Sequence, residues 1–378
     1  MVKKISYPFL ITALVLVVLG SLFLSTVSAL DSLKIHGNTT HYLFRHLIYI
    51  VIGTLAGFIF FKAPLAKLKK SSFILFVLTL IATSAVIIPG LGVRIYGASR
   101  WISIGGFTFQ PSELLKVTAI LVVAAFLSTR PGLVDYQRGR TSLINLAAKG
   151  KQNLLSVFLP LLVLVGAISI ALILQPDIST LAIIALSLVV IYFAAGTPVW
   201  HVFLMGIAGA GAGYILILLK PYRWERLLVF LNPETDPLGI GYQMKQSLIA
   251  IGSGGWLGKG IGMSAQKFGF LPLAMSDSIF AILAEETGII GCAILIMLFL
   301  AFLWFGLKIA NSATDKFAKL SAIGITFWIT FQAFFNITST IGIFPVSGLP
   351  LPFFSYGGSH IIAELIGVGI LLNISKNG

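Results

Sequence analysis

Residues 154–174 read LLSVFLPLLVLVGAISIALIL and residues 178–195 read ISTLAIIALSLVVIYFAA, with only Gln175, Pro176 and Asp177 between them. Neither run contains a charged residue, and each approaches the roughly 20 residues that a helix needs to cross the hydrocarbon core of a bilayer. The two runs therefore predict a pair of membrane-spanning helices joined by a tight turn at the membrane surface.

Similar apolar runs recur along the chain, of which 57% is hydrophobic and 10% charged. A typical soluble domain carries about 25% charged residues. The N-terminal run up to Ala29 is too long for the core of a secretory signal, so we expect an uncleaved first span. The further predicted spans are 43–61, 73–89, 111–129, 154–174, 178–195, 198–219, 277–307, 319–341 and 359–375.

This pattern predicts an all-α integral membrane protein with about ten transmembrane helices, in one domain that covers residues 1–378. A long loop at 220–276 separates the seventh and eighth helices. Lysines and arginines near Lys3, Lys62, Arg130, Lys308 and Lys376 all fall on one side of this layout, which the positive-inside rule identifies as the cytoplasmic side. The 220–276 segment is then extracytoplasmic.

The composition excludes several classes of function. The net charge of +14 does not indicate a nucleic-acid partner, because most cations lie between apolar runs, where they set topology. Cys292 is the only cysteine, which excludes disulfides and thiolate metal sites. The five histidines show no HExxH spacing, so the sequence predicts no resident metal and no redox carrier.

A second group of cations lies on the predicted outer side, against the usual topological bias. Such cations suit an anionic ligand, and arginine in particular bonds two phosphate oxygens at once. The long loop is also rich in glycine, so its backbone amides could approach a ligand in a cavity. The outer cations are Arg94, Arg100, Lys220, Arg223, Arg226, Lys245, Lys259 and Lys267.

Two acidic residues in the predicted spans have both a structural and a functional reading. Glu113 lies one helical turn from Lys116, so the two could form a buried ion pair or contact a substrate directly. Asp177 could cap the helix that follows it, or it could belong to a site at the outer surface.

Asp277 is the strongest candidate for chemistry. It opens the eighth span directly after the cationic loop, and Ser276 could cap that helix without it. A partly desolvated carboxylate facing a cationic pocket is suited to take a proton from a substrate hydroxyl. Glu285 and Glu286 lie deeper on the same helix, where we expect polar contacts within the bundle.

Several blocks of sequence, in order and spread over residues 99–359, resemble the SEDS family (shape, elongation, division and sporulation). Within the family, the run from Gln246 to Gly255 and the run from Gly262 to Lys267 are more similar to the division branch, FtsW, and its sporulation relative than to RodA. The blocks are Ser99-Arg100-Trp101-Ile102, Phe109 to Lys116, Gln175-Pro176-Asp177, Asn232-Pro233 with Asp236, Gly239 to Gln243, Gln246 to Gly255, Ala284-Glu285-Glu286 and Leu351 to Ser359.

The resemblance implies a peptidoglycan glycosyltransferase of the bacterial cytoplasmic membrane, which polymerises lipid II into β-1,4-linked glycan at the outer face. The family's essential aspartate falls on Asp277, which would be the catalytic base. Its usual neighbours are replaced by Leu273, Met275, Ser276 and Ser278. The candidate substrate-binding residues are Arg100, Glu113, Lys116, Asp177, Arg223, Tyr242, Gln243, Lys245, Lys259, Lys267 and Ser355.

The same resemblance implies partners and leaves two rival functions open. The substrates would be lipid II and undecaprenyl-linked glycan, and the partners a class B penicillin-binding transpeptidase and other divisome membrane proteins. No cofactor is required, although a divalent cation, Mg²⁺ or Mn²⁺, could share the charge of the leaving pyrophosphate. The rivals are a lipid II flippase using Glu113, Lys116 and Asp177, and a scaffold that only positions the transpeptidase.

Overall fold

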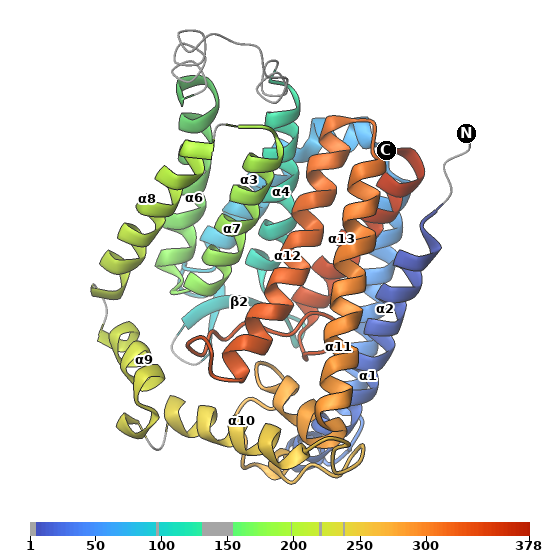
Figure 1. The fold of residues 1–378 in the computed structure, drawn as a ribbon, viewed down its shortest axis with the longest axis vertical. Coiled ribbons are helices and arrows are strands. Elements are labelled where there is room, and N and C mark those ends of the chain that lie inside the picture. Colours follow the sequence, from blue (N-terminus) through green and yellow to red (C-terminus); the bar gives the residue numbers. More distant parts are fainter. Residues whose placement is uncertain (1–4, 96–97, 131–153, 198, 219–220, 237–238) are drawn as a thin grey trace.

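The computed structural model describes residues 5–95, 98–130, 154–197, 199–218, 221–236 and 239–378 (Figure 1). Long helices dominate it and run roughly parallel to one another (Figure 1). The long helices are α1 (Tyr7–His36), α2 (His41–Lys62), α3 (Leu65–Ala85), α4 (Pro111–Ser128), α6 (Leu159–Leu174), α7 (Ile178–Ala194), α8 (Val199–Leu218), α11 (Ile279–Ser312), α12 (Lys316–Thr340) and α13 (Gly358–Asn377).

Seven helices in the described ranges are long and apolar enough to cross a membrane, and α7 and part of α8 are shorter apolar helices. α4, α12 and α13 are largely buried and form the centre, whereas α1, α2 and α6 turn most of their surface outward. The outward surface is apolar, with Phe73, Phe203 and Trp304 among its most exposed side chains. The prediction of a multi-pass helical membrane protein is confirmed.

Both termini lie at one end of the bundle, the upper end in Figure 1. The opposite end carries α9 (Pro221–Leu231) and α10 (Ile240–Gly254), and α10 lies across the bundle rather than along it (Figure 1). The predicted loop at 220–276 is thus partly helical. A one-turn helix, η3 (Pro233–Thr235), joins α9 to α10, and a further turn, η4 (Gln266–Phe268), precedes α11.

The connection between α3 and α4 adds a small antiparallel sheet to this otherwise helical fold. Its strands are β1 (Gly92–Ile95), β2 (Ala98–Ile104) and β3 (Phe107–Phe109), in the order β1-β2-β3. Gly105 and Gly106 form the turn between the last two strands with φ of 57° and 81°, which suits glycine in a two-residue hairpin. Three short strands in a single loop give too weak a pattern to predict.

The glycine-rich segment 255–268 packs against the first part of α11, where that helix departs from helical geometry at Gly288 (φ 65°, ψ −164°). The amide of Lys259 donates to the carbonyl of Glu285, and the amide of Ile289 donates to that of Gly255. A Cβ on Gly258 would lie 2.2 Å from the carbonyl oxygen of Glu286, so a side chain would disrupt this contact. The glycines serve close backbone packing here.

Candidate active site

Asp277 lies in the turn that leads into α11, and its main chain is held from two other parts of the chain. The Asn336 side-chain amide, from α12, donates to the carbonyls of Asp277 (2.9 Å) and Leu349 (2.7 Å). The Ser355 hydroxyl donates to the carbonyl of Ser276 at 2.5 Å and accepts from a backbone amide. Ser355 therefore positions the turn, and its hydroxyl is not free for a substrate.

The expected cap of α11 is wrong. The helix begins at Ile279 with Ser278 at its N-cap, and no side chain caps it. The Ser276 hydroxyl instead donates to the carbonyl of Leu273 at 3.4 Å. Asp277 is accordingly not used as a cap either, which leaves its carboxylate available.

The Asp277 carboxylate lines a cavity of about 170 Å³. Gly348 lies beside it with φ of 70°, a conformation that favours glycine, and a Cβ there would lie 3.6 Å from Asp277 Oδ2. Burial raises the pKa of Asp277 to about 6, and the Ser276 side chain and the charges of Arg226 and Arg100 partly oppose that rise. The acid is therefore poised near neutral pH.

Arg100 and Asp177 form a second wall of the same cavity. Arg100, on β2, places Nη1 3.8 Å from Asp177 Oδ1, and it donates to the main-chain carbonyls of Gln175 and Pro176. Asp177 also accepts from Gln110 Nε2 at 3.2 Å and caps α7 by accepting from the Thr180 amide at 3.4 Å. The capping role of Asp177 is confirmed, and since the same residue lines the cavity, a role in substrate binding stays a prediction.

Glu113 and Lys116 form a buried ion pair at 2.7 Å, with side chains 5% and 1% exposed. Lys116 also donates to Gln332 Oε1 at 2.9 Å and lies over the Trp328 ring. Glu113 lines the cavity and Lys116 does not. The pair thus supports the floor of the site, and only Glu113 is placed to meet a ligand.

Lys259 and Lys267 lie away from this cavity and pair with the protein's own carboxylates. Lys259 Nζ is 2.7 Å from Glu285 Oε1, and Lys267 Nζ is 3.3 Å from Glu286 Oε1. The amides of Ala265 and Gln266 also donate to Glu285. The polar role expected of the two glutamates fits this geometry, whereas the amides of the glycine-rich segment face glutamate rather than a ligand.

This arrangement predicts unequal effects from the two members of one ion pair. Glu285→Ala removes the buried acceptor of several donors and should destabilise the fold by about 3–5 kcal/mol. Lys259→Ala should cost about 1 kcal/mol or less, because its side chain is 39% exposed. Thermal unfolding of the two purified variants in the same detergent checks the order, and equal midpoints would contradict it.

The remaining predicted residues lie on α9 and α10. Gln243 Nε2 donates to the Ser278 hydroxyl at 3.0 Å, next to Asp277, whereas Tyr242 is half-buried and Lys245 exposed. The backbone of Arg223 lies in α9, and its side chain is outside the described part of the chain, as is all of Lys220.

Three further residues shape the site, and of these only Arg226 was singled out in the sequence, as one of the outer cations. Arg226 donates to the Val346 carbonyl at 3.5 Å, and its charge lowers the pKa of Asp277. Asn336 and His360 come from the last two helices, and His360 lines the cavity. No pattern described in the sequence pointed to these two residues.

The described residues offer no ready-made metal site, since no three His, Cys, Asp or Glu side chains gather there. The carboxylates that line the cavity are those of Glu113, Asp177 and Asp277. A divalent cation shared with substrate therefore stays a prediction.

Comparison with known proteins agrees with the resemblance seen in the sequence. Residues 7–378 match the family model for FtsW, RodA and SpoVE, described as a cell cycle protein. Stage V sporulation protein E of Bacillus subtilis is 35% identical over 377 residues, covering 99% of this chain and 98% of that protein. The probable peptidoglycan glycosyltransferase FtsW of Coxiella burnetii is 35% identical over 368 residues, covering 97% and 94%.

Solved structures share the fold. A chain from a peptidoglycan synthase complex, whose structure concerns the coordination of polymerization and crosslinking, superposes with a TM-score of 0.77 at 26% identity and covers 99% of this chain and 98% of its own. The rod shape determining protein RodA of Thermus thermophilus gives a TM-score of 0.68 at 23% identity, covering 99% and 98%. The chain belongs to the FtsW, RodA and SpoVE family of SEDS proteins.

Proposed function

We propose that this protein is a peptidoglycan glycosyltransferase that polymerises lipid II for cell division or a related phase of wall synthesis, with Asp277 as its general base. The observation that carries the proposal is the Asp277 carboxylate. It caps no helix, its pKa is raised to about 6, and Asp277 and Arg100 line the same cavity. A base with this pKa is ionised at neutral pH and still able to take a proton in the transition state.

The reaction joins two lipid-linked sugars. The 4-hydroxyl of one lipid II attacks the anomeric carbon of the second lipid-linked sugar, and the proton of that hydroxyl passes to Asp277. Undecaprenyl diphosphate leaves from the anomeric carbon, which inverts to give a β-1,4 link. Arg100 and Arg226 are the cations whose charges lower the pKa of Asp277. We therefore assign to them the stabilisation of the negative charge on the leaving pyrophosphate. Lys259 and Lys267, held by glutamates, are not assigned this role.

We place the site at the outer face of the bacterial cytoplasmic membrane. The start of α11, which Asp277 precedes by two residues, lies with α9 and α10 at the end of the bundle away from both termini (Figure 1). Lys62, Lys308 and Lys376 lie at helix ends near the termini, which is the cytoplasmic end by the positive-inside rule. A class B transpeptidase is the expected partner, since the structural relative comes from a complex concerned with polymerization and crosslinking.

A polymerisation assay tests the proposal against its rivals. The purified chain, with and without a class B transpeptidase, receives labelled lipid II in detergent, and glycan chains are resolved by gel. Chain growth supports the enzyme. If the protein, placed in liposomes, moves labelled lipid II from one leaflet to the other without chain growth, the result would favour a flippase. If it shows neither activity but still binds the transpeptidase, the result would favour a scaffold.

The polymerisation rate should depend on pH through Asp277. Because the base works only when ionised, the rate should fall about tenfold per unit as pH drops below about 6. Arg226→Gln removes a cation that lowers the Asp277 pKa, so this acid limb should move to higher pH. The exposed Lys245→Gln serves as the control with an unchanged limb; an unchanged limb in Arg226→Gln would contradict the assignment.

A further inference from the structure

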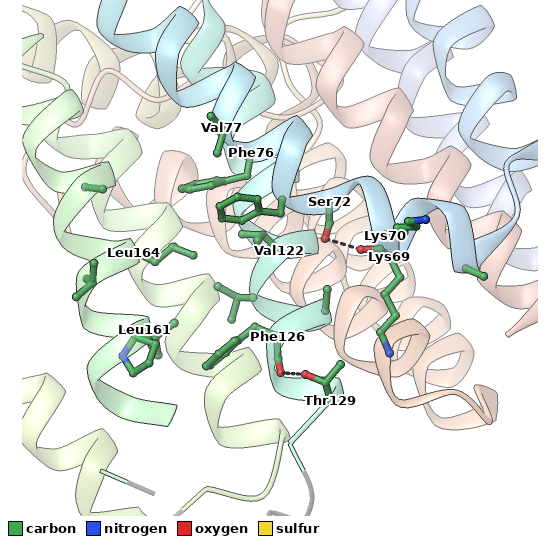
Figure 2. A pocket seen from close by; sticks show the side chains of 17 residues that line it. Lys69, Lys70, Ser72, Phe76, Val77, Val122, Phe126, Thr129, Leu161 and Leu164 are labelled. Carbon is green, nitrogen blue, oxygen red and sulfur yellow. Dashed lines mark hydrogen bonds between the residues drawn. The ribbon is translucent and has the colours of Figure 1, made fainter. Parts of the chain in front are cut away.

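An apolar groove lies between α3, α4 and α6, near the end of the bundle where α4 ends (Figure 2). Its volume is about 770 Å³. Phe76, Val122, Phe126, Leu161 and Leu164 project into it from the three helices (Figure 2). At its rim, Phe73 and Val163 are 64% and 66% exposed, so the groove opens sideways, toward lipid, rather than into the bundle.

The few polar groups of the groove divide into two kinds. The hydroxyls of Ser72 and Thr129 donate to carbonyls of their own chain segment, each at 2.8 Å (Figure 2), so neither needs a ligand. The other two polar residues in the lining are Lys69 and Lys70, at the start of α3. A third cation joins them, because the guanidinium of Arg130 lies 4.7 Å from the centre of the Phe126 ring.

Neither lysine nor Arg130 forms an ion pair with a carboxylate in the described part of the chain. Lys69, Lys70 and Arg130 are therefore three cations near one end of an apolar groove. An acyl chain gains little by moving from lipid into such a groove, since both surroundings are apolar. Selective binding must then come from the head group, and clustered lysine and arginine select a phosphate with net negative charge.

We propose that this groove binds an anionic phospholipid, with one acyl chain along α3, α4 and α6 and its phosphate at Lys69, Lys70 and Arg130. The cationic end lies roughly 27 Å along α4 from Pro111, which opens that helix beside the Asp277 cavity, at 1.5 Å per residue. The phospholipid is therefore distinct from the polymerisation substrate, and the proposal stands independently of the catalytic one.

Native mass spectrometry of the full chain in detergent tests this inference with dipalmitoyl phosphatidylglycerol and dipalmitoyl phosphatidylcholine. The wild type should retain phosphatidylglycerol more tightly. Each cation removed should weaken that binding roughly fivefold, so K69Q/K70Q/R130Q should weaken it roughly a hundredfold and leave phosphatidylcholine unchanged. The matched control, K308Q/K316Q/K319Q, removes three cations from the same end of the bundle, at α11 and α12.

An equal loss of phosphatidylglycerol binding in both triple variants would mean that the lipid is held by general charge attraction, and it would overturn the site. No loss of binding in either variant would also overturn it. A separate variant tests the groove itself. Ala125→Trp fills the groove from α4 without changing charge and should weaken phosphatidylglycerol binding, whereas unchanged binding would overturn the placement of the acyl chain. Thermal unfolding of each variant shows that lipid loss does not come from loss of fold.

Discussion

Asp277→Asn is expected to lower the polymerisation rate by about 10²–10⁴-fold, the usual contribution of a general base. Asparagine has nearly the same shape, and the main chain of residue 277 would still be held by Asn336. The amide cannot accept the proton of the attacking hydroxyl. The rate of glycan formation from labelled lipid II at pH 7.5, with transpeptidase present, gives the measurement.

Two controls separate lost chemistry from lost structure. Glu234→Gln makes the same carboxyl-to-amide change at an exposed position of the same outer segment and should polymerise as the wild type does. A carboxyl with a raised pKa costs stability as pH rises through about 6, so Asp277→Asn should be at least as stable as the wild type at pH 8. Near-normal polymerisation by Asp277→Asn would show that Asp277 is not the general base.

Lys116→Met is expected to lower the stability of the fold by about 3–5 kcal/mol. It leaves the Glu113 carboxylate buried without its ion-pair partner and takes a donor from Gln332. Glu113→Gln/Lys116→Met removes both charges and should recover most of that loss, because no uncompensated ion remains.

Thermal unfolding of the single and double variants in detergent checks this second prediction. The single variant should unfold several degrees below the double variant and the wild type. If the double variant is the least stable of the three, the ion pair contributes net stability and the argument from unpaired charge is wrong.

The sequence was sufficient for those parts of the fold and site that depend on local pattern. Uncharged runs near 20 residues predicted the spans. Asp277 stood out because it is an acid at the start of a span that the helix does not require as a cap. Asp177 and Arg100 followed from the same logic of unusual charges. Each of these inferences depends on the free-energy cost of placing an ion in a membrane. Because of that cost, charged residues in spans are rare, and their positions can be seen in a single sequence.

What the sequence could not supply was the pairing of distant charges. Lys259 and Lys267 read as ligand-binding cations, yet Glu285 and Glu286 lie beside them once the glycine-rich segment packs on α11. Arg226 reads only as one of eight outer cations, and nothing along the chain shows that its charge lowers the pKa of Asp277. Such pairings depend on how helices pack, and no spacing rule along the chain encodes that.

The way in which Asp277 is held has a consequence for the order in which a working protein is made. Asn336 and Ser355 fix the turn around this aspartate, and both follow it in the chain. During synthesis, a chain that ends before α12 already carries the aspartate but lacks the groups that orient it. Activity can therefore begin only after α12 and the segment up to Ser355 have been made, so a chain that ends before them does not polymerise glycan.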